Sequence, residues 1–302
     1  MLLASSLFFF TTKEFTFEDY YFDTYVQGKI YSKNPILAKK AINKIKNEFK
    51  RIDTFNVQGI TSGKIDTSFI TIIKKSLSFS EKTEGYFDIS IDPILKKWNY
   101  FNTPTLPSKE EIEALLPLVD YKKITIRKDT LIIPEDFSLN LGGAAKGYAL
   151  NRAKNILEKC KISSALIDAG GDVLLVVKKR GKDKWLIGIR KPRGAQGIIG
   201  ILKVNDCFVF TSGDYERYFT IESKRYHHIV DPFTGYSAEG LSSATIIVKD
   251  GIKGDCISTA LVAMGTKKAK NYIKNNNLDA VLVDTSENIY KLIDKDKINL
   301  YE

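Results

Sequence analysis

Both histidines of this 302-residue chain lie side by side, at His227 and His228, in a segment rich in hydroxyl, acidic and arginine side chains. Histidine is the side chain whose ordinary pKa, about 6.5, allows it to exchange protons near neutral pH. Any reaction that needs a histidine base must therefore use one of these two residues.

The residues around the two histidines predict where they lie. The run 226–230 is β-branched and aromatic, which favours a strand with His227 and His228 on opposite faces. The Pro and Gly of residues 231–235 predict a turn directly after it, so His228 is expected at a strand end. A catalytic histidine and an ordinary hydrogen-bonded strand histidine both remain open from this segment alone.

A Gly-rich segment, NLGGAAKGYA at residues 140–149, predicts the start of a helix that carries Lys146 in its first turns. Helix N-termini and free backbone amides bind phosphate, and a lysine adds a mobile positive charge. The spacing matches neither a Walker A motif nor GxGxxG. A closely packed glycine turn therefore explains the segment equally well.

Two further segments combine acids with small residues. DAGGD at residues 168–172 joins two apolar strands, and a hairpin turn is the favoured interpretation. In the helical segment 254–265, Asp255 and Thr259 are one turn apart on the same face, where their oxygens could hold a hard cation such as magnesium. An N-cap Asp with a helix-facing Thr is the competing interpretation.

The elements that would position these residues indicate an α+β fold, with mixed or antiparallel sheets and packed helices, because hairpins and helices alternate without a regular βαβ period. Helices are expected at 35–52, 66–82, from 108 onward, 144–160, 255–264 and 266–275. Strands are expected at 20–31, 123–133, 164–178, 184–190, 198–212, 216–230, 242–249, 279–284 and 288–293.

Composition limits the classes of protein to consider. With 43% hydrophobic residues the chain can bury a full core, and its three cysteines lack the spacing of a zinc site or disulfide framework. The net charge of +10 is spread along the chain, which argues against a nucleic-acid partner but favours an anionic ligand or a membrane surface.

The N-terminal run MLLASSLFFF has the size of a signal-peptide core but lacks a basic flank. An export-signal remnant or leader over residues 1–19 and a plain first strand are equally acceptable. Residues 20–302 are expected to form a single domain. No other segment is apolar and long enough to cross a membrane.

Taken in chain order, these segments resemble the ApbE-type FAD:protein FMN transferase family from about Phe22 to Gly265. The matching pieces are FD with DP and Trp98, then LGGAAKGYA, DAGGD, TSGDYERYF, HHIVDPFTG and DCISTALVAMG. The resemblance implies an ApbE-like, T-fold-related architecture. It also implies binding of FAD with magnesium, cleavage of the pyrophosphate, and attachment of FMN through a phosphoester to a Ser or Thr of another protein, with release of AMP.

The resemblance assigns roles to individual residues. Magnesium would be held by the Asp255 carboxylate, the Thr259 hydroxyl and the Gly143 carbonyl. His228 would act as general base, and Lys146 would neutralise a phosphate oxygen. The residues expected to shape the flavin site are Thr211, Ser212, Gly213, Asp214 and Arg217, with Tyr148 and Asp168 nearby.

The implied acceptor is a protein with a Ser/Thr-Gly-Ala-Ser/Thr motif, such as a redox-pump subunit or a flavin reductase. This chain lacks that motif, so transfer is expected in trans. Members of the family typically act in the bacterial periplasm or at the outer face of the inner membrane, and the sequence leaves a cytoplasmic location open. The alternatives are an FAD pyrophosphatase that yields FMN and AMP, and a non-catalytic FAD-binding carrier.

The chain departs from the family pattern at several positions. Asn140 replaces the usual Asp, Ala144 the usual Ile, and Asp168 the frequent Asn, while residues 22–24 match Met-Gly-Thr only loosely. These differences bear on how FAD is bound, because the expected metal and base residues are all present.

Overall fold

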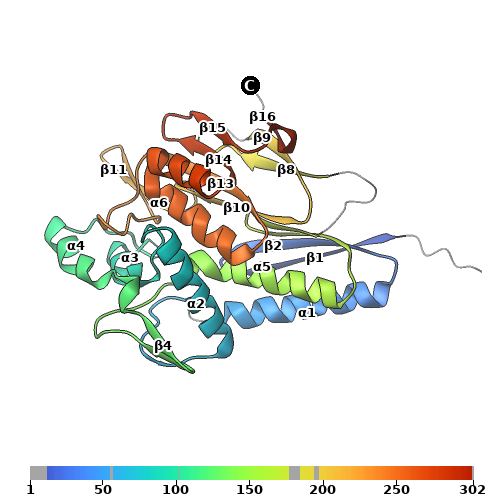
Figure 1. Ribbon diagram of the computed structural model, residues 1–302, viewed down its shortest axis with the longest axis horizontal. Coiled ribbons are helices and arrows are strands. Elements are labelled where there is room, and N and C mark those ends of the chain that lie inside the picture. Colours follow the sequence, from blue (N-terminus) through green and yellow to red (C-terminus); the bar gives the residue numbers. More distant parts are fainter. Residues whose placement is uncertain (1–11, 55–56, 101, 177–183, 194–196, 301–302) are drawn as a thin grey trace, which may run out of the picture.

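The computed structural model describes residues 12–54, 57–100, 102–176, 184–193 and 197–300. Its centre is an eight-stranded sheet with the order β1-β2-β6-β7-β10-β13-β14-β15, in which every pair of neighbouring strands is antiparallel (Figure 1). Three small sheets surround it: β11-β12, β16-β9-β8 and β3-β5-β4. The α+β prediction is confirmed.

The strands are β1 Lys13–Tyr21, β2 Thr24–Ser32, β3 Gly63–Lys64, β4 Thr125–Arg127, β5 Thr130–Ile132, β6 Ser164–Ala169, β7 Asp172–Val176, β8 Trp185–Arg190, β9 Ile198–Val204, β10 Cys207–Gly213, β11 Tyr218–Ile221, β12 Lys224–His227, β13 Leu241–Val248, β14 Asp279–Asp284, β15 Ile289–Leu292 and β16 Ile298–Leu300. The helices are α1 Pro35–Asp53, α2 Thr67–Lys82, α3 Asp92–Trp98, α4 Lys109–Leu115, α5 Gly142–Lys159 and α6 Gly251–Asn275. Short 3-10 helices are η1 Ile89–Ile91, η2 Leu116–Leu118, η3 Tyr121–Lys123 and η4 Lys295–Lys297.

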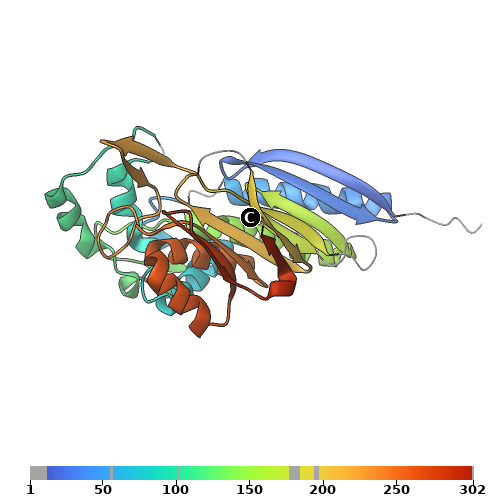
Figure 2. The same cartoon turned by 90° about the horizontal axis from the view of Figure 1, so that it is seen from above.

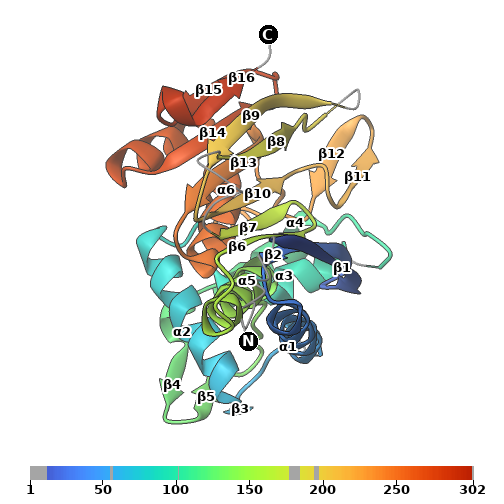
Figure 3. The same cartoon turned by 90° about the vertical axis from the view of Figure 1, so that its right-hand side faces the viewer.

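The large sheet is covered on both faces. Figure 3 shows α1, α2, α5 and α6 on one face and β8, β9 and β16 on the other. Strand β7 illustrates the consequence: Leu174 and Val176 belong to the core under the helices, while Val173 and Leu175 belong to the core under the small sheet. Because side chains alternate along a strand, β7 is apolar on both faces.

The first long helix shows how sequence specifies an element. Asn34 caps α1, its side chain accepting from the backbone N–H of Ile36 at 2.9 Å and of Leu37 at 3.2 Å. Pro35 occupies the first helical position, where its missing N–H costs nothing. Such a cap stabilises a helix by about 1 kcal/mol. The helix ends at Asp53, so the expected helix 35–52 is confirmed.

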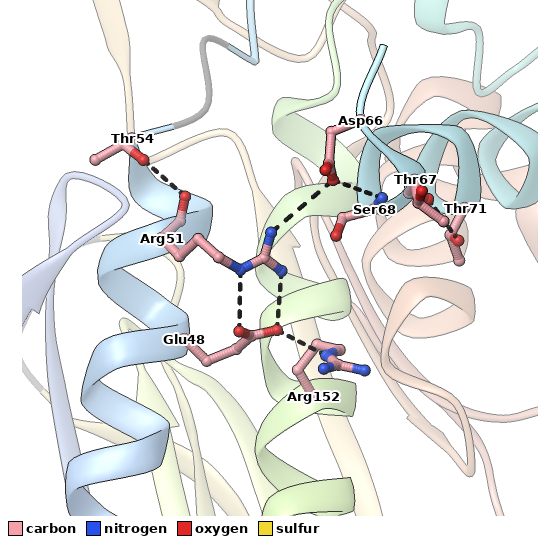
Figure 4. A network of polar contacts seen from close by, with 8 residues as sticks. All are labelled: Glu48, Arg51, Thr54, Asp66, Thr67, Ser68, Thr71 and Arg152. Carbon is pink, nitrogen blue, oxygen red and sulfur yellow. Dashed lines mark hydrogen bonds and ion pairs between the residues drawn. The ribbon is translucent and has the colours of Figure 1, made fainter. Parts of the chain in front are cut away.

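A carboxylate joins α1 to α5. Glu48 on α1 accepts from Arg51 of its own helix at 2.9 and 3.0 Å and from Arg152 of α5 at 2.7 Å (Figure 4). Arg51 also approaches Asp66, at 4.0 Å, and Asp66 caps the N-terminus of α2. The network therefore connects α1, α2 and α5, three of the helices on this face of the sheet.

Several expected strands are hairpins in the structure. The ranges 20–31, 123–133, 164–178 and 216–230 each contain a hairpin, and 198–212 contains two strands, β9 and β10, that belong to different sheets. Some of these turns are made by non-glycine residues with positive φ, such as Phe22 at 56° and Glu222 at 47°, which no Gly or Pro in the sequence announces. In contrast, the expected helices 255–264 and 266–275 form one element, α6, with a break at Gly265.

At the N-terminal end, β1 begins at Lys13, ahead of the domain boundary expected at residue 20, and pairs with β2 along its whole length. Residues 1–11, which carry most of the expected leader, lie outside the described residues. Among the described helices, none combines the length and apolar character that crossing a bilayer requires.

Candidate active site

A cavity of about 500 Å³ lies where the N-terminus of α5 meets α6, β10 and the start of the β11-β12 hairpin. The turn between β1 and β2 and residues 86–95 complete its wall. Most of the residues expected from the sequence line this cavity, namely Gly143, Lys146, Thr211, Ser212, Gly213, Arg217, His228, Asp255 and Thr259. Tyr148, Asp168 and Asp214 are not among its lining residues.

Close packing of two helices brings the chemical groups together. A Cβ at Gly147 of α5 would lie 2.3 Å from the carbonyl oxygen of Gly251 on α6, and the converse substitution would meet the same obstacle. The backbones therefore touch at this crossing, which only glycine permits. Packing thus explains Gly147, and its consequence is that Lys146 and Asp255 face one cavity.

Asp255 lies inside α6, and Asp250, whose side chain accepts from the backbone N–H of Lys253 at 3.0 Å, is the N-cap. The N-cap interpretation of Asp255 is therefore wrong. Its carboxylate is 5% exposed and accepts from the backbone N–H of Gly147 at 2.8 Å. Burial, together with the nearby charge of Asp172, raises the pKa of Asp255 to about 7.

Thr259 and Gly143 complete the group expected to hold a metal. The Thr259 hydroxyl donates to the Asp255 carbonyl at 3.0 Å, as a helix-facing threonine does, and lies 3.3 Å from the Ser212 hydroxyl. Gly143 has non-helical angles, φ −88° and ψ 20°, and a Cβ there would lie 3.4 Å from the Thr259 hydroxyl. The three residues are thus neighbours on the cavity wall.

The chemistry of these donors suits a hard cation. A carboxylate, a hydroxyl and a backbone carbonyl are oxygen ligands, and magnesium prefers oxygen and retains several waters. Over the ranges that the structure describes, no group of three or more His, Cys, Asp or Glu side chains is arranged to hold a metal. The candidate set contains one such residue, Asp255, so a site of this kind would bind weakly without a ligand that adds oxygens.

Lys146 forms an ion pair with Asp172, a residue that was not among those expected in the site. Both side chains line the cavity, and the Asp172 carboxylate also accepts from the backbone N–H of Thr211 at 3.2 Å. Burial opposes the charge of Lys146, but Asp172 and Asp255 together raise its pKa, so the ammonium persists at neutral pH. The sequence feature that could have indicated Asp172 as a site residue is its position directly after the two glycines of DAGGD.

Asp168, at the start of the same segment, has a structural role. Its side chain accepts from the backbone N–H of Gly171 at 2.7 Å, inside a turn whose glycines have φ of 68° and 96°. The favoured interpretation of DAGGD as a hairpin turn between β6 and β7 is therefore correct. The last acid of the motif, Asp172, lines the cavity, whereas the first, Asp168, does not.

The β10 residues contribute hydroxyls. Thr211 lies 2.9 Å from the Thr245 hydroxyl, and Ser212 lies 2.9 Å from the Ser258 hydroxyl. Behind them, Asp214 is buried, at 1% exposure, and forms ion pairs with Arg193 and Arg225. We therefore infer that Asp214 fixes the position of the end of β10, residues 211–213, which lines the cavity.

Tyr148 lies in the main core beneath the sheet, at 7% exposure. Its ring belongs to the apolar packing between the helices and the sheet. We therefore assign it to the packing behind α5.

The two histidines are separated as expected, although β12 ends at His227 and His228 follows it. His227 is buried, and its Nε2 lies 2.8 Å from the Ala238 carbonyl. His228 lines the cavity, and its Nδ1 lies 3.3 Å from the Arg217 carbonyl. If Nδ1 donates this weak bond, the Nε2 lone pair is free. Burial, with the nearby His227 and Arg217, lowers the pKa of His228 to about 3, so the ring is neutral at pH 7.

Comparison with known proteins agrees with this geometry. The ApbE family model matches residues 22–282. The chain belongs to the ApbE family. It is 30% identical over 278 residues to the FAD:protein FMN transferase of Klebsiella pneumoniae (strain 342), which covers 86% of this chain and 86% of the relative.

Solved structures of ApbE proteins share the fold. The crystal structure of the ApbE protein from Thermotoga maritima matches with a TM-score of 0.85 at 31% identity, covering 92% of this chain and 97% of that one. The apo form of the flavinyl transferase ApbE from Pseudomonas stutzeri matches with a TM-score of 0.79 at 24% identity, covering 91% and 92% of the two chains. The resemblance expected from the sequence motifs is thus confirmed.

Proposed function

We propose that this chain is a magnesium-dependent FAD:protein FMN transferase, which cleaves FAD, attaches FMN to a Ser or Thr of an acceptor protein and releases AMP. The observation that carries the proposal is that one cavity gathers a neutral histidine, a half-buried ammonium and three neighbouring oxygen donors, namely His228, Lys146, Asp255, Thr259 and Gly143. The activity named for the Klebsiella pneumoniae relative supports it.

The pyrophosphate of FAD would bind at the N-terminus of α5. The N–H groups of Gly142, Ala144 and Ala145 already have partners, so the helix dipole, which favours an anion, would attract the pyrophosphate more than free amides would. Lys146, oriented by Asp172, would neutralise a phosphate oxygen. Magnesium held by Asp255, Thr259 and Gly143 would offset negative charge on the phosphates, which is the electrostatic assistance that phosphoryl transfer chiefly needs.

His228 would act as the general base for the acceptor hydroxyl. In the transfer step, the acceptor hydroxyl oxygen forms a bond to the phosphorus of the FMN half, the bond from that phosphorus to the bridging oxygen breaks, and AMP leaves with that oxygen. The hydroxyl proton passes to Nε2 of His228. A neutral ring is required for this role, and the lowered pKa of His228 keeps it neutral.

The acceptor is proposed to carry a Ser/Thr-Gly-Ala-Ser/Thr motif, as on a redox-pump subunit or a flavin reductase. The test is intact mass spectrometry of a small acceptor domain with this motif, after incubation with the chain, FAD and magnesium, with and without EDTA. We expect a mass gain equal to FMN that EDTA abolishes and that His228→Ala reduces by at least a hundredfold.

Other outcomes would point elsewhere. An unmodified acceptor together with free FMN and AMP would show a pyrophosphatase. Intact FAD bound to the protein would show a carrier. Transfer by His228→Ala at the original rate would remove the histidine from the mechanism while leaving the transferase activity in place.

A further inference from the structure

The β11-β12 hairpin has a free edge beside the cavity. Among the strands in the described part of the chain, β11 pairs only with β12, across a two-residue turn. In such a hairpin the residue pair next to the turn is hydrogen-bonded, and non-hydrogen-bonded and hydrogen-bonded pairs then alternate along the strands. The backbone bond from His228 N–H to the Arg217 carbonyl, at 3.1 Å, agrees with this pattern. The backbone N–H and C=O of Tyr218 and Thr220 therefore point away from β12.

These outward groups have no partner within the described part of the chain. Proteins usually protect exposed strand edges with charged residues. The sequence of β1, an edge of the large sheet, follows that rule, with Lys13, Glu14, Glu18 and Asp19 among its residues. The sequence of β11, YFTI, contains no charge.

The free edge is held in place by aromatic packing. Phe219 and Tyr226 stack with ring centroids 5.4 Å apart, and both rings contact Trp98, at 6.2 and 5.4 Å. The guanidinium of Arg225 lies over the ring of Tyr218, 3.9 Å from its centroid. An isolated two-stranded hairpin is only marginally stable, so these contacts fix a strand edge that is ready to pair.

The edge leads into the cavity. Glu216 and Arg217, directly before β11, line the cavity, and His228, directly after β12, lines it too. Figure 2 shows the hairpin, in orange-brown, at the same end of the molecule as the green helices α3 and α4. An extended peptide that paired with β11 and continued past Arg217 would enter the cavity.

We infer that the free edge of β11 binds an extended segment of the acceptor polypeptide as an added strand, and that this strand delivers the acceptor hydroxyl to His228. The inference rests on the proposed transferase function. Pairing of this kind uses main-chain hydrogen bonds for affinity, so it places few demands on the sequence that flanks the modified residue. The small Gly-Ala pair of the proposed motif suits a backbone that must enter the cavity.

Replacement of Thr220 by proline tests the inference. Thr220→Pro removes an outward N–H without removing a bond to β12, and proline is tolerated on strand edges. We expect the KM for the acceptor domain to rise about tenfold, while FAD binding, followed by flavin fluorescence, is unchanged. The matched control is Thr16→Pro, which removes an outward N–H from the edge of β1. Thr220→Val, which keeps the N–H, should behave as the unmodified protein.

Amide hydrogen exchange of the unmodified protein gives an independent measurement. An acceptor domain whose modified residue is replaced by alanine should slow exchange at the Tyr218 and Thr220 amides. Because this measurement needs no substitution in the enzyme, it tests strand pairing even if Thr220→Pro impairs FAD binding. Unchanged exchange, or a loss of transfer in Thr16→Pro alone, would overturn the inference while the transferase function stood. Failure of the unmodified protein to modify any acceptor would instead overturn the function, and the inference with it.

Discussion

At the scale of single residues, two of the carboxylates that line the cavity, Asp172 and Asp255, form a charged group with the Lys146 ammonium. Lys146 contacts Asp172 directly, and Asp255 lies close enough to raise the pKa of Lys146 as well. A buried charge is stable only with partners, and this group carries one negative charge in excess when both acids are ionised. A divalent cation beside Asp255 would more than offset that excess and leave positive charge for the phosphates of FAD, which agrees with the proposed metal site.

Asp172 is expected to orient Lys146. In Asp172→Asn the lysine loses its ion-pair partner, and we expect kcat for FMN transfer to fall at least tenfold, because the ammonium is no longer held toward the phosphates. The measurement is steady-state transfer followed by mass spectrometry. Asp168→Asn is the matched control, because that carboxylate caps only the turn between β6 and β7. Equal losses in the two variants would refute an orienting role.

Asp255 should make magnesium affinity depend on pH. Its pKa of about 7 in the metal-free protein lies above its ordinary value, so the proton is bound below pH 7 and must leave before a cation binds. We expect the half-saturating magnesium concentration to be about tenfold higher at pH 6 than at pH 8. The pKa of His228, about 3, lies well below this pH range, whereas burial also raises the pKa of the neighbouring Asp172. Titration of the activity with magnesium at both pH values measures the effect, and identical curves would contradict it.

Residue chemistry that is local in sequence could be predicted, and chemistry that depends on tertiary contact could not. The composition reduced a histidine base to His227 or His228, and the Gly-rich helix start drew attention to Lys146, but the roles of His228 and Lys146 came from the resemblance to the ApbE family. The pairing of Lys146 with Asp172 requires β7 to lie beside α5, which no spacing in the sequence reveals. Whether Asp255 caps α6 or lies inside it depends on where the helix begins, and the true N-cap, Asp250, was not recognised in the sequence.

At the scale of elements, the site depends on how the helices are fixed to one another. The contact of α5 with α6 at Gly147 and Gly251 sets the position of both cavity walls, and Glu48 ties α5 to α1 on the opposite side. Helices α1, α2 and α4 were expected from the sequence, whereas α3 was not, and α6 was expected as two helices that began at residue 255. The crossing of α5 and α6 could not be predicted, because a glycine that permits backbone contact looks the same in sequence as one that makes a turn.

The Glu48 contacts should stabilise the fold in a pH-dependent way. The Glu48 side chain is 14% exposed, and hydrogen bonds from Arg51 and Arg152 lower its pKa despite burial. We expect Glu48→Gln to reduce the free energy of unfolding by about 1–2 kcal/mol at pH 7.

The sign of the pH effect follows from the lowered pKa. The carboxylate stabilises the fold above its ordinary pKa of 4.5, and this contribution disappears as the pH falls through the lower, folded-state pKa. Urea denaturation at pH 7 and pH 3 should therefore show a difference between variant and parent that shrinks at pH 3. Glu158→Gln, on the exposed surface of α5, is the control that should change little. A difference that persisted in full at pH 3 would assign the effect to packing.

At the scale of the whole molecule, the cavity is built from segments far apart in the chain. The β1-β2 turn, residues 86–95, the start of α5, the end of β10 and the middle of α6 all contribute to its wall. Each can be recognised as a motif, but their convergence depends on the strand order β6-β7-β10-β13, which places β10 and α6 beside α5. A ligand that bridges these segments should therefore stabilise the entire fold.

Binding of FAD and of magnesium should be coupled through this shared site. Because the cation would balance charge on both Asp255 and the pyrophosphate, each ligand should raise the affinity for the other, by at least tenfold, or about 1.4 kcal/mol. In thermal unfolding of His228→Ala, chosen so that FAD remains intact, the two ligands together should raise the melting temperature by more than the sum of their separate effects. Asp255→Asn should bind FAD yet show simple additivity, since the carboxylate that joins the two ligands is missing. A carrier that recognises the flavin alone would show the same FAD stabilisation with and without magnesium, and that result would contradict the metal-dependent transferase.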